Sequence, residues 1–510
     1  MDREKRDAHG TPRQQMPNVC NANPIRPLAA MPHATKVWIT PRNHEPALAR
    51  CVLGKQPFTF VETPPMQLER RWLLGAGLGL SSLGIGASRA SARTRTAAAS
   101  DLGVAPDTGR DVTAALQAAI DRAAERKVQL QLGPGRYIVR GLELRPGTHL
   151  TGTGPATVLQ QAAGTPVLTG RSATDVSVEN LTVKGGFPLT GNSRGLIELQ
   201  RCGRIMLREL TVEVSTANAI MLERCGGVVT GCRITGAAKA GIFSLDAEGG
   251  LEVSHNHLAA IGNNGILVWR SATGEDGTVV AMNRIEKIAA RDGGTGQNGN
   301  GINVFRAGGV LVTANRIADC AFSAVRANSA SNVQINGNNI ARMGEVAIYA
   351  EFAFEGAVIT SNLVDGAATG ISVTNFDHGG RLAVVQGNLV RNLFRRPAEP
   401  HTSGYGIAVE ADAAITGNTI EGAPSAGLLI GWGRFCRDVA ATGNVIRTCG
   451  VGIAVTGDTT AGAVLIASNI ITGSQQGAIR MMDHGRLHGD DLALRTSAQG
   501  RIRATGNVVV

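Results

Sequence analysis

The sequence predicts an all-β fold in which short parallel strands coil into a solenoid, with one α-helix at its N-terminal end. Three observations predict this fold. Glycine accounts for 66 of 510 residues while 43% of residues are hydrophobic, a balance that favours a large core of repetitive β structure over helices. A short motif recurs along residues 161–510, and one amphipathic segment precedes it.

The recurring motif consists of Asn-x-apolar, a short turn and Gly-Ile-x-Val, and it stands complete in TGNVIRTCGVGIAV at 442–455. Weaker copies occur at 178–183, 207–212 and 229–234, and the count predicts about 12 coils. Strands of three to five residues cannot close a core alone, but coils stacked about 4.8 Å apart can. The motif's asparagine returns every 23 to 38 residues, at Asn256, Asn283, Asn315, Asn338, Asn362, Asn388, Asn418, Asn444, Asn469 and Asn507.

We interpret these asparagines as structural. Asparagine tolerates the left-handed backbone conformation of a corner, and it often follows glycine here. Stacked side-chain amides can also hydrogen-bond from coil to coil.

The segment 111–127, DVTAALQAAIDRAAERK, predicts an amphipathic helix. Its apolar residues are Val112, Leu116, Ile120 and Ala124, and Asp111 or Thr113 can serve as the N-cap. We expect this helix to cover the open end of the first coil, since an exposed strand edge invites aggregation. Residues 93–160 would then hold the capping helix and first coils, and residues 161–510 the repeats.

The stretch MQLERRWLLGAG at 66–77 indicates an export signal. Arg70 and Arg71 precede an uncharged, glycine-interrupted stretch, and a small-residue cleavage site ends at Ala92. The stretch is shorter than the roughly 20 apolar residues of a membrane span. It resembles a Tat signal, which implies the Tat machinery as a partner and the periplasm or the exterior as the location. We expect translation to start at Met66; the alternative is that residues 1–65 form a disordered extension.

Three segments carry a resemblance to a known fold. They are 107–109 (DTG), 132–137 (LGPGRY) and 150–154 (LTGTG). They resemble the opening of pectate-lyase-like right-handed parallel β-helix proteins, which include rhamnogalacturonases and epimerases. The resemblance implies a single-stranded right-handed β-helix. Residues 66–510 resemble the uncharacterised twin-arginine-translocated repeat proteins, a family that implies no particular activity, and pectate-lyase catalytic motifs do not match residue by residue.

Charge and cysteine content exclude several classes of partner. Residues 1–92 hold 12 Lys/Arg and 6 Asp/Glu, so the remainder has 38 minus 34, or +4, from totals of 50 and 40. Such a small excess gives no reason to expect nucleic acid. The six cysteines after residue 92 lack paired C-x-x-C spacing, so we expect no metal site formed by cysteines. The sequence does not identify a cofactor.

A candidate site follows from the register of the Gly-Ile-x-Val strands. Because Ile and Val point inward, the x residue and the residue after Val point outward on one face. Aromatic and charged residues gather on this face or just after it, flanked by long loops at 286–300, 391–405 and 481–501. Exposed aromatic rings beside polar groups suit the stacking of sugars. The predicted substrate-binding residues are Trp269, Phe305, Arg306, Asn328, Phe376, Trp432 and Arg434.

Two catalytic hypotheses arise from the same face. Glu351 and Glu410 lie in one outward column two coils apart, about 9.6 Å at the backbone, which approaches the carboxyl separation of inverting glycosidases. Alternatively, Arg326 neutralises a uronate carboxylate while Tyr349 or His378 moves a proton in a lyase or epimerase, with Asp377 orienting the imidazole. We therefore expect an exported protein that acts on a polysaccharide; the rival is a non-catalytic envelope protein that only binds glycan or builds assemblies.

Overall fold

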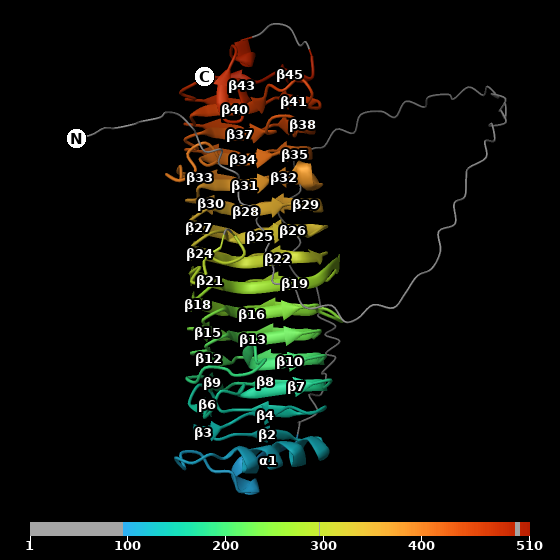
Figure 1. The fold of residues 1–510 in the computed structure, drawn as a ribbon, viewed down its shortest axis with the longest axis vertical. Helices are drawn as coiled ribbons and strands as arrows, with labels where there is room; N and C mark the ends of the chain where they lie inside the picture. The colour runs from blue at the N-terminus through green and yellow to red at the C-terminus, as the bar shows by residue number, and fades with distance from the viewer. Residues whose placement is uncertain (1–94, 295, 495–499) are drawn as a thin grey trace, which may run out of the picture. The chain divides into compact units, whose positions relative to one another are not determined.

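The computed structural model describes residues 95–294, 296–494 and 500–510. The predicted extension at 1–65 and the predicted signal, with Arg70, Arg71 and Ala92, lie outside the described residues. Within them the strands form three parallel sheets, and the chain passes from sheet A to sheet B to sheet C in each coil (Figure 1).

Sheet A contains 16 strands within the described part of the chain, each parallel to its neighbours. In spatial order they are β1 (Thr96–Ala98), β2 (Gln129–Gln131), β5 (His149–Thr151), β8 (Thr174–Glu179), β11 (Gly203–Arg208), β14 (Gly227–Thr230), β17 (Leu251–Ser254), β20 (Val279–Ala281), β23 (Leu311–Thr313), β26 (Val333–Asn336), β29 (Glu355–Thr360), β32 (Arg381–Gln386), β35 (Ala411–Thr416), β38 (Arg437–Thr442), β41 (Val464–Ala467) and β45 (Ile502–Thr505).

Sheet B contains 15 parallel strands over the same residues. They are β3 (Gly135–Val139), β6 (Thr157–Gln161), β9 (Thr182–Lys184), β12 (Thr211–Glu213), β15 (Arg233–Thr235), β18 (His257–Ile261), β21 (Arg284–Ile288), β24 (Arg316–Cys320), β27 (Asn339–Met343), β30 (Leu363–Asp365), β33 (Leu389–Arg391), β36 (Thr419–Glu421), β39 (Val445–Arg447), β42 (Ile470–Thr472) and β46 (Val508–Val509).

Sheet C also contains 15 described strands, and its last strand is antiparallel to the one before it. They are β4 (Leu142–Glu143), β7 (Leu168–Arg171), β10 (Gly195–Gln200), β13 (Asn218–Glu223), β16 (Ala240–Leu245), β19 (Asn264–Glu275), β22 (Asn300–Gly308), β25 (Val325–Asn328), β28 (Val346–Glu351), β31 (Thr369–Val373), β34 (Tyr405–Val409), β37 (Ala426–Ile430), β40 (Val451–Thr456), β43 (Ile479–Asp483) and β44 (Arg486–His488).

The predicted all-β solenoid is confirmed, and its about 14 turns compare with the 12 coils expected. The core runs along the solenoid axis as one cluster of inward-facing Ile, Val and Leu from all three sheets. The described residues also contain three short 3-10 helices. They are η1 (Ala99–Leu102), η2 (Phe376–His378) and η3 (Leu492–Leu494). No helix among the described residues is long and apolar enough to cross a membrane.

The predicted asparagine ladder is present and lies inside the core. Asn362, for example, is 1% exposed and donates from Nδ2 to the carbonyl of Ile335 (3.0 Å) and to Oδ1 of Asn388 (3.0 Å). The explanation by left-handed backbone is corrected: the residue before each ladder asparagine has positive φ, such as Ser361 at 56° and Gly387 at 64°. The asparagine itself turns inward because the preceding residue makes the corner.

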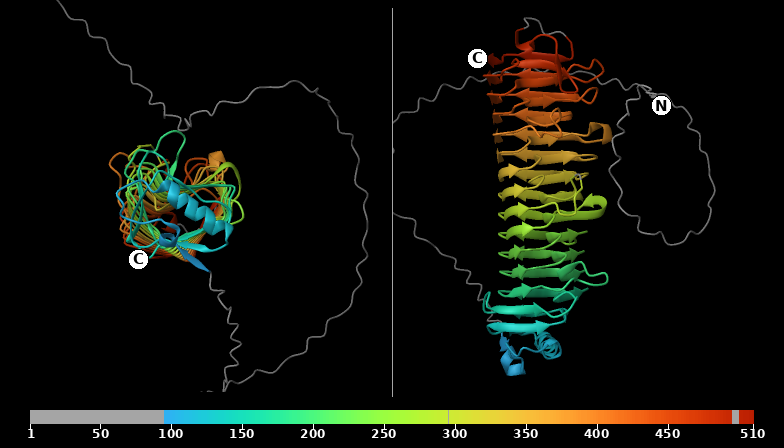
Figure 2. Two further views of the ribbon diagram at one scale, coloured as in Figure 1. Left: turned by 90° about the horizontal axis from the view of Figure 1, so that it is seen from below. Right: turned by 60° about the vertical axis from the view of Figure 1, so that its left-hand side comes forward.

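The predicted helix forms α1 (Thr113–Glu125), which is two residues shorter at each end than the predicted segment 111–127. Its buried residues Leu116, Ala119, Ile120 and Ala123 pack in the core cluster against the first coil. The left view of Figure 2 shows α1 lying across the end of the coils. Asp111 supports its start, accepting a hydrogen bond from the Thr113 amide through Oδ1 (2.9 Å), while Val112 occupies the N-cap position.

Candidate functional site

The predicted site residues on the strands of sheet C form two outward columns, as the repeat register indicated. One column passes from Trp269 to Phe305, Asn328 and Glu351 on successive strands, and the other passes from Asn303 to Arg326 and Tyr349. Neighbouring members are separated by one strand spacing, about 4.8 Å. Sheet C therefore presents a continuous outer face, which we call the C face.

The predicted long loops do flank the C face. The loop between β21 and β22 packs on Arg326, since a β-carbon at Gly296 would lie 1.8 Å from Nη1 of that arginine. The loop between β33 and β34 brings Arg396 to Glu345, with 3.2 Å between Nη1 and Oε1. A β43–β44 hairpin supplies the third wall.

Half-buried aromatic side chains run along one part of the C face. Phe243, Trp269 and Phe305 lie on β16, β19 and β22, with ring centroids 5.3 Å and 5.5 Å apart. Trp269 donates from Nε1 to Oδ1 of Asn303 (3.2 Å), and the exposed guanidinium of Arg306 lies 4.7 Å from the Phe305 centroid. We call Phe243, Trp269 and Phe305 the aromatic ladder. It offers ring surfaces bordered by hydrogen-bonding groups.

A buried ion-pair cluster follows on β25 and β28. Glu351 is 1% exposed and binds Arg326 through two contacts, Nε to Oε1 (2.6 Å) and Nη2 to Oε2 (2.8 Å). Asn328 donates a third hydrogen bond to Oε1 (2.8 Å), and Glu345 lies 3.5 Å from Nη1 of Arg326. Glu351 thus holds Arg326 in place, and its carboxylate is directed toward β25.

Tyr349 packs beside this cluster, with the Arg326 guanidinium carbon 5.0 Å from its ring centroid. Burial, reinforced by the nearby charge of Glu351, raises the pKa of Tyr349 to about 12. The phenol therefore keeps its proton at neutral pH, so in this arrangement Tyr349 is suited to donate a hydrogen bond and not to accept a proton.

Replacing Arg326 with leucine should lower the free energy of unfolding by about 3–5 kcal/mol, because Glu351 would remain buried without its cation. Chemical denaturation measures this loss. The matched control is Arg342→Leu, which breaks the exposed Arg342–Asp319 ion pair and should cost less than about 1 kcal/mol. Equal losses for both variants would contradict the assigned importance of the buried cluster.

Glu410 follows β34 and is a carboxyl of a different kind. Its Oε2 accepts a hydrogen bond from the backbone amide of Phe376 (2.7 Å), in the turn after β31. Burial raises the pKa of Glu410 to about 7; the charge of Asp377 adds to the rise, and the hydrogen bond from Phe376 opposes it. Glu410 can therefore exchange a proton near neutral pH.

Glu351 and Glu410 do not share a partner, since Glu351 bonds to β25 and Glu410 to the turn after β31. Their pairing as two catalytic acids stays a prediction. The contacts of Glu351 favour a positioning role for it.

Both Asp-His-Gly segments place a carboxylate against an imidazole. Oδ2 of Asp377 lies 3.0 Å from Nδ1 of His378, and Oδ1 of Asp483 lies 2.6 Å from Nδ1 of His484. His378 contacts Phe352 edge-on, with centroids 5.6 Å apart. Both histidines are exposed, so each ring is oriented and accessible to solvent.

The remaining predicted binding residues lie around Glu410 and the hairpin. Phe376 stacks under the guanidinium of Arg437 at 4.6 Å. Trp432 meets His484 edge-on at 5.5 Å between centroids, and exposed Arg434 lies 5.1 Å from the Phe435 centroid. The predicted residues therefore form three groups: the aromatic ladder and the ion-pair cluster on the C face, and the Glu410 group in the turns that lead from sheet C to sheet A.

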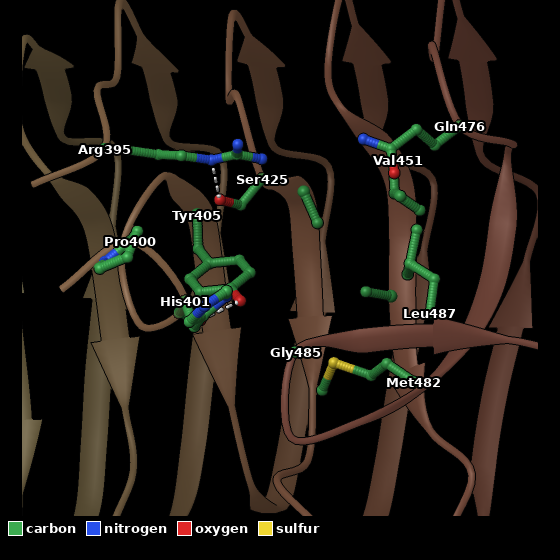
Figure 3. Close-up of a pocket in the computed structure, with 12 residues that line it drawn as sticks. Arg395, Pro400, His401, Tyr405, Ser425, Val451, Gln476, Met482, Gly485 and Leu487 are labelled. Atoms are coloured by element: carbon green, nitrogen blue, oxygen red, sulfur yellow. Dashed lines mark hydrogen bonds between the residues drawn. The ribbon is translucent and has the colours of Figure 1, made fainter. Parts of the chain in front are cut away.

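A pocket of about 150 Å³ opens beside the Glu410 group, at the edge of the C face (Figure 3). Sequence reasoning missed its residues, although it identified the loops that supply two of its walls. Ala426 and Val451 of its floor occupy a third outward position, at the start of each strand, that the repeat analysis did not consider. Its lining comprises Arg395, Pro400, His401, Tyr405, Ser425, Ala426, Val451, Ala454, Gln476, Met482, Gly485 and Leu487.

No group of three or more His, Cys, Asp or Glu side chains in the described ranges is arranged to hold a metal ion. The six cysteines of these ranges are buried free thiols.

Comparison with protein families finds a match over residues 271–446, to a family described as "Right handed beta helix region". This part of the chain is a right-handed β-helix. The matched region includes Arg326, Tyr349, Glu351 and Glu410. No curated protein matches the sequence as a whole.

Several solved structures resemble the chain at low identity. The catalytic unit of a GH87 alpha-1,3-glucanase from Streptomyces thermodiastaticus has a TM-score of 0.48 and 16% identity, over 81% of this chain and 68% of that one. Tailspike protein 2 of bacteriophage CBA120 gives 0.43 and 12%, over 58% and 48%. A mannuronan C-5 epimerase module from Azotobacter vinelandii gives 0.36 and 16%, over 81% and 99%.

Proposed function

We propose that the protein binds a polysaccharide along the C face and acts on it, with Glu410 as the residue that donates a proton. The observation that carries this proposal is the pKa of Glu410, about 7, directly after a strand of the sheet that carries a row of aromatic rings. A general acid is most effective when its pKa lies near the working pH, because it is then protonated and still acidic.

The aromatic ladder supports a carbohydrate ligand in particular. Sugar rings stack on aromatic faces, while Asn303 and Arg306 at the ladder's edge can bind hydroxyl or carboxylate groups. Trp269 and Phe305 are register partners on neighbouring strands, so their rings follow the solenoid axis, and the Phe243 ring contacts Trp269 diagonally from β16. Such a row suits an extended chain of sugars better than a single one.

In a hydrolase of this kind, Glu410 gives its proton to the glycosidic oxygen as the bond to the sugar carbon breaks. Asp377 raises the pKa of Glu410 and is itself exposed. It is therefore the nearby carboxylate suited to take a proton from the water molecule that attacks the same sugar carbon. Arg326 is buried under the loop between β21 and β22 and is held by Glu351 and Glu345, so its contacts favour a positioning role over direct contact with a uronate. His378 serves elimination or epimerisation if the substrate is a uronate.

Export through the Tat system remains part of the proposal and rests on residues 66–92 alone. It would place the protein where extracellular or envelope polysaccharides are found.

The test is incubation of purified protein with neutral and uronate-containing polysaccharides, with binding and product formation measured for each. We expect at least one to bind and to be shortened or modified. If one binds unchanged while no substrate in a broad panel is altered, the non-catalytic rival replaces the enzyme proposal. If none binds, the polysaccharide proposal fails.

A further inference from the structure

The pocket in Figure 3 has an apolar floor and a polar rim. Ala426, Val451 and Ala454 lie on the outer side of β37 and β40 and are each at most 2% exposed. Met482 and Leu487 of the hairpin close one side of this floor. Figure 3 shows Arg395 and Gln476 along the opposite edge. A flat ligand with one apolar face and polar edges suits such a lining.

The rim is positively charged. The lining includes one arginine and one histidine and neither aspartate nor glutamate. Arg395 is fixed by the loop between β36 and β37. Its Nε donates to Oγ of Ser425 (2.9 Å) and its Nη2 to the carbonyl of Pro424 (2.6 Å). These two bonds leave Nη1 directed to neither partner. An oriented guanidinium with a remaining donor favours an anionic group such as a carboxylate.

The loop and the hairpin that close the pocket are each fixed by a contact of their own. Tyr405 donates from its hydroxyl to the carbonyl of His401 (2.7 Å), which fixes the loop carrying His401 over the floor. A β-carbon at Gly485 would lie 3.2 Å from that carbonyl and 3.5 Å from the Trp432 ring, so the hairpin turn packs tightly on the same wall. The site is therefore preformed, which reduces the entropy lost on binding.

We propose that this pocket binds one carboxylate-bearing sugar unit of the polysaccharide, a uronate, with its ring between the accessible side chains of Pro400 and Leu487 and its carboxylate on Arg395. The inference rests on the proposed polysaccharide function and deepens it by naming the sugar class. At about 150 Å³ the pocket is well below the roughly 300–1,000 Å³ typical of larger ligands, so it suits one ring.

A second, more open pocket continues from the first and shares Arg395 and Gln476 with it. It has a volume of about 340 Å³ and is lined also by Leu393, Pro424 and Thr448. The neighbouring sugar of the same chain can extend into this space. Arg395 then stands between two consecutive sugar positions.

The experiment is isothermal titration of a uronate oligosaccharide, and of the same oligosaccharide with its carboxyls reduced to alcohols, into the full-length protein. We expect Arg395→Gln to bind the uronate form about tenfold more weakly or worse, and to bind the reduced form as the wild type does. Arg395→Lys, which keeps the charge but loses the fork, should recover part of the affinity. Thermal melting checks that each variant is folded.

Arg316→Gln is the matched control, because Arg316 is an exposed arginine on β24 of sheet B, away from the C face. It should leave both affinities unchanged. Unaltered uronate binding by folded Arg395→Gln overturns the pocket proposal while the polysaccharide function stands. A wild type that binds neither oligosaccharide, nor any polysaccharide in the broader panel, overturns the function itself.

Discussion

Glu410→Gln is expected to lose at least 100-fold in turnover on the polysaccharide that the wild type modifies, with little change in binding. The amide retains the size of the carboxyl but has no proton to donate, and general acid catalysis typically contributes 10²–10⁴-fold. Wild-type activity should fall as the pH rises through about 7, where Glu410 ionises. Initial rates measured across pH for both proteins test this expectation.

The same variant has a second expected effect, on stability, that is independent of substrate. The folded state raises the pKa of Glu410 from 4.5 to about 7, so it favours the protonated form. Folding is therefore unpenalised below pH 4.5 and loses stability as the pH rises through about 7. Because glutamine cannot ionise, Glu410→Gln should be more stable than the wild type by about 3 kcal/mol at pH 8 and equal to it at pH 4.

Retention of full activity by Glu410→Gln would remove Glu410 from the mechanism. Asp438→Asn is a suitable control, because Asp438 is an exposed acid on β38 of sheet A. It should leave the rate unchanged.

Asn362→Ala should lower the free energy of unfolding by about 4 kcal/mol. The substitution removes the donor to Ile335 and to Asn388, and it removes the Oδ1 that accepts from both the backbone amide and the Nδ2 of Asn338. Each buried polar group left without a partner costs about 1–3 kcal/mol. Denaturant titration followed by circular dichroism measures the loss.

Asn339→Ala is the control for the ladder. Asn339 is exposed on β27 of sheet B, next to the buried ladder residue Asn338, so we expect a change below about 1 kcal/mol. If both asparagine variants lose the same stability, the ladder is not the source of cohesion between coils that the structure indicates.

The periodic part of the fold could be predicted from sequence because each coil repeats the same solution. Asn256 and its successors mark the coils directly. The copies of the motif at 178–183, 207–212 and 229–234 are weaker because the ladder position there is held by Leu181, Leu210 and Cys232, the residues just before β9, β12 and β15. A buried leucine fills this position without the polar signal that the asparagine motif supplies.

The outward columns could also be predicted, because alternation along a strand fixes which side chains point out. The sequence could not predict which of these side chains remain accessible. Glu351 and Glu410 occupy equivalent positions after Gly-Ile-x-Val or its variants, yet Glu351 is 1% exposed under loops that arrive from distant residues. The pocket around Arg395 was missed for the same reason, since its walls come from 395–401 and 482–487 and meet only in three dimensions.

Two double variants test directly whether polysaccharide binds to the C face. Trp269→Ala with Phe305→Ala removes two rings of the aromatic ladder. Val358→Ala with Val384→Ala removes two exposed apolar side chains that are register partners on sheet A. Affinity for the bound polysaccharide is then measured for both proteins and the wild type.

We expect the sheet C variant to bind about tenfold to 100-fold more weakly, because two stacking surfaces are lost, and the sheet A variant to bind as the wild type does. Wild-type affinity in the sheet C variant, with a loss confined to the sheet A variant, would place the ligand on a different face.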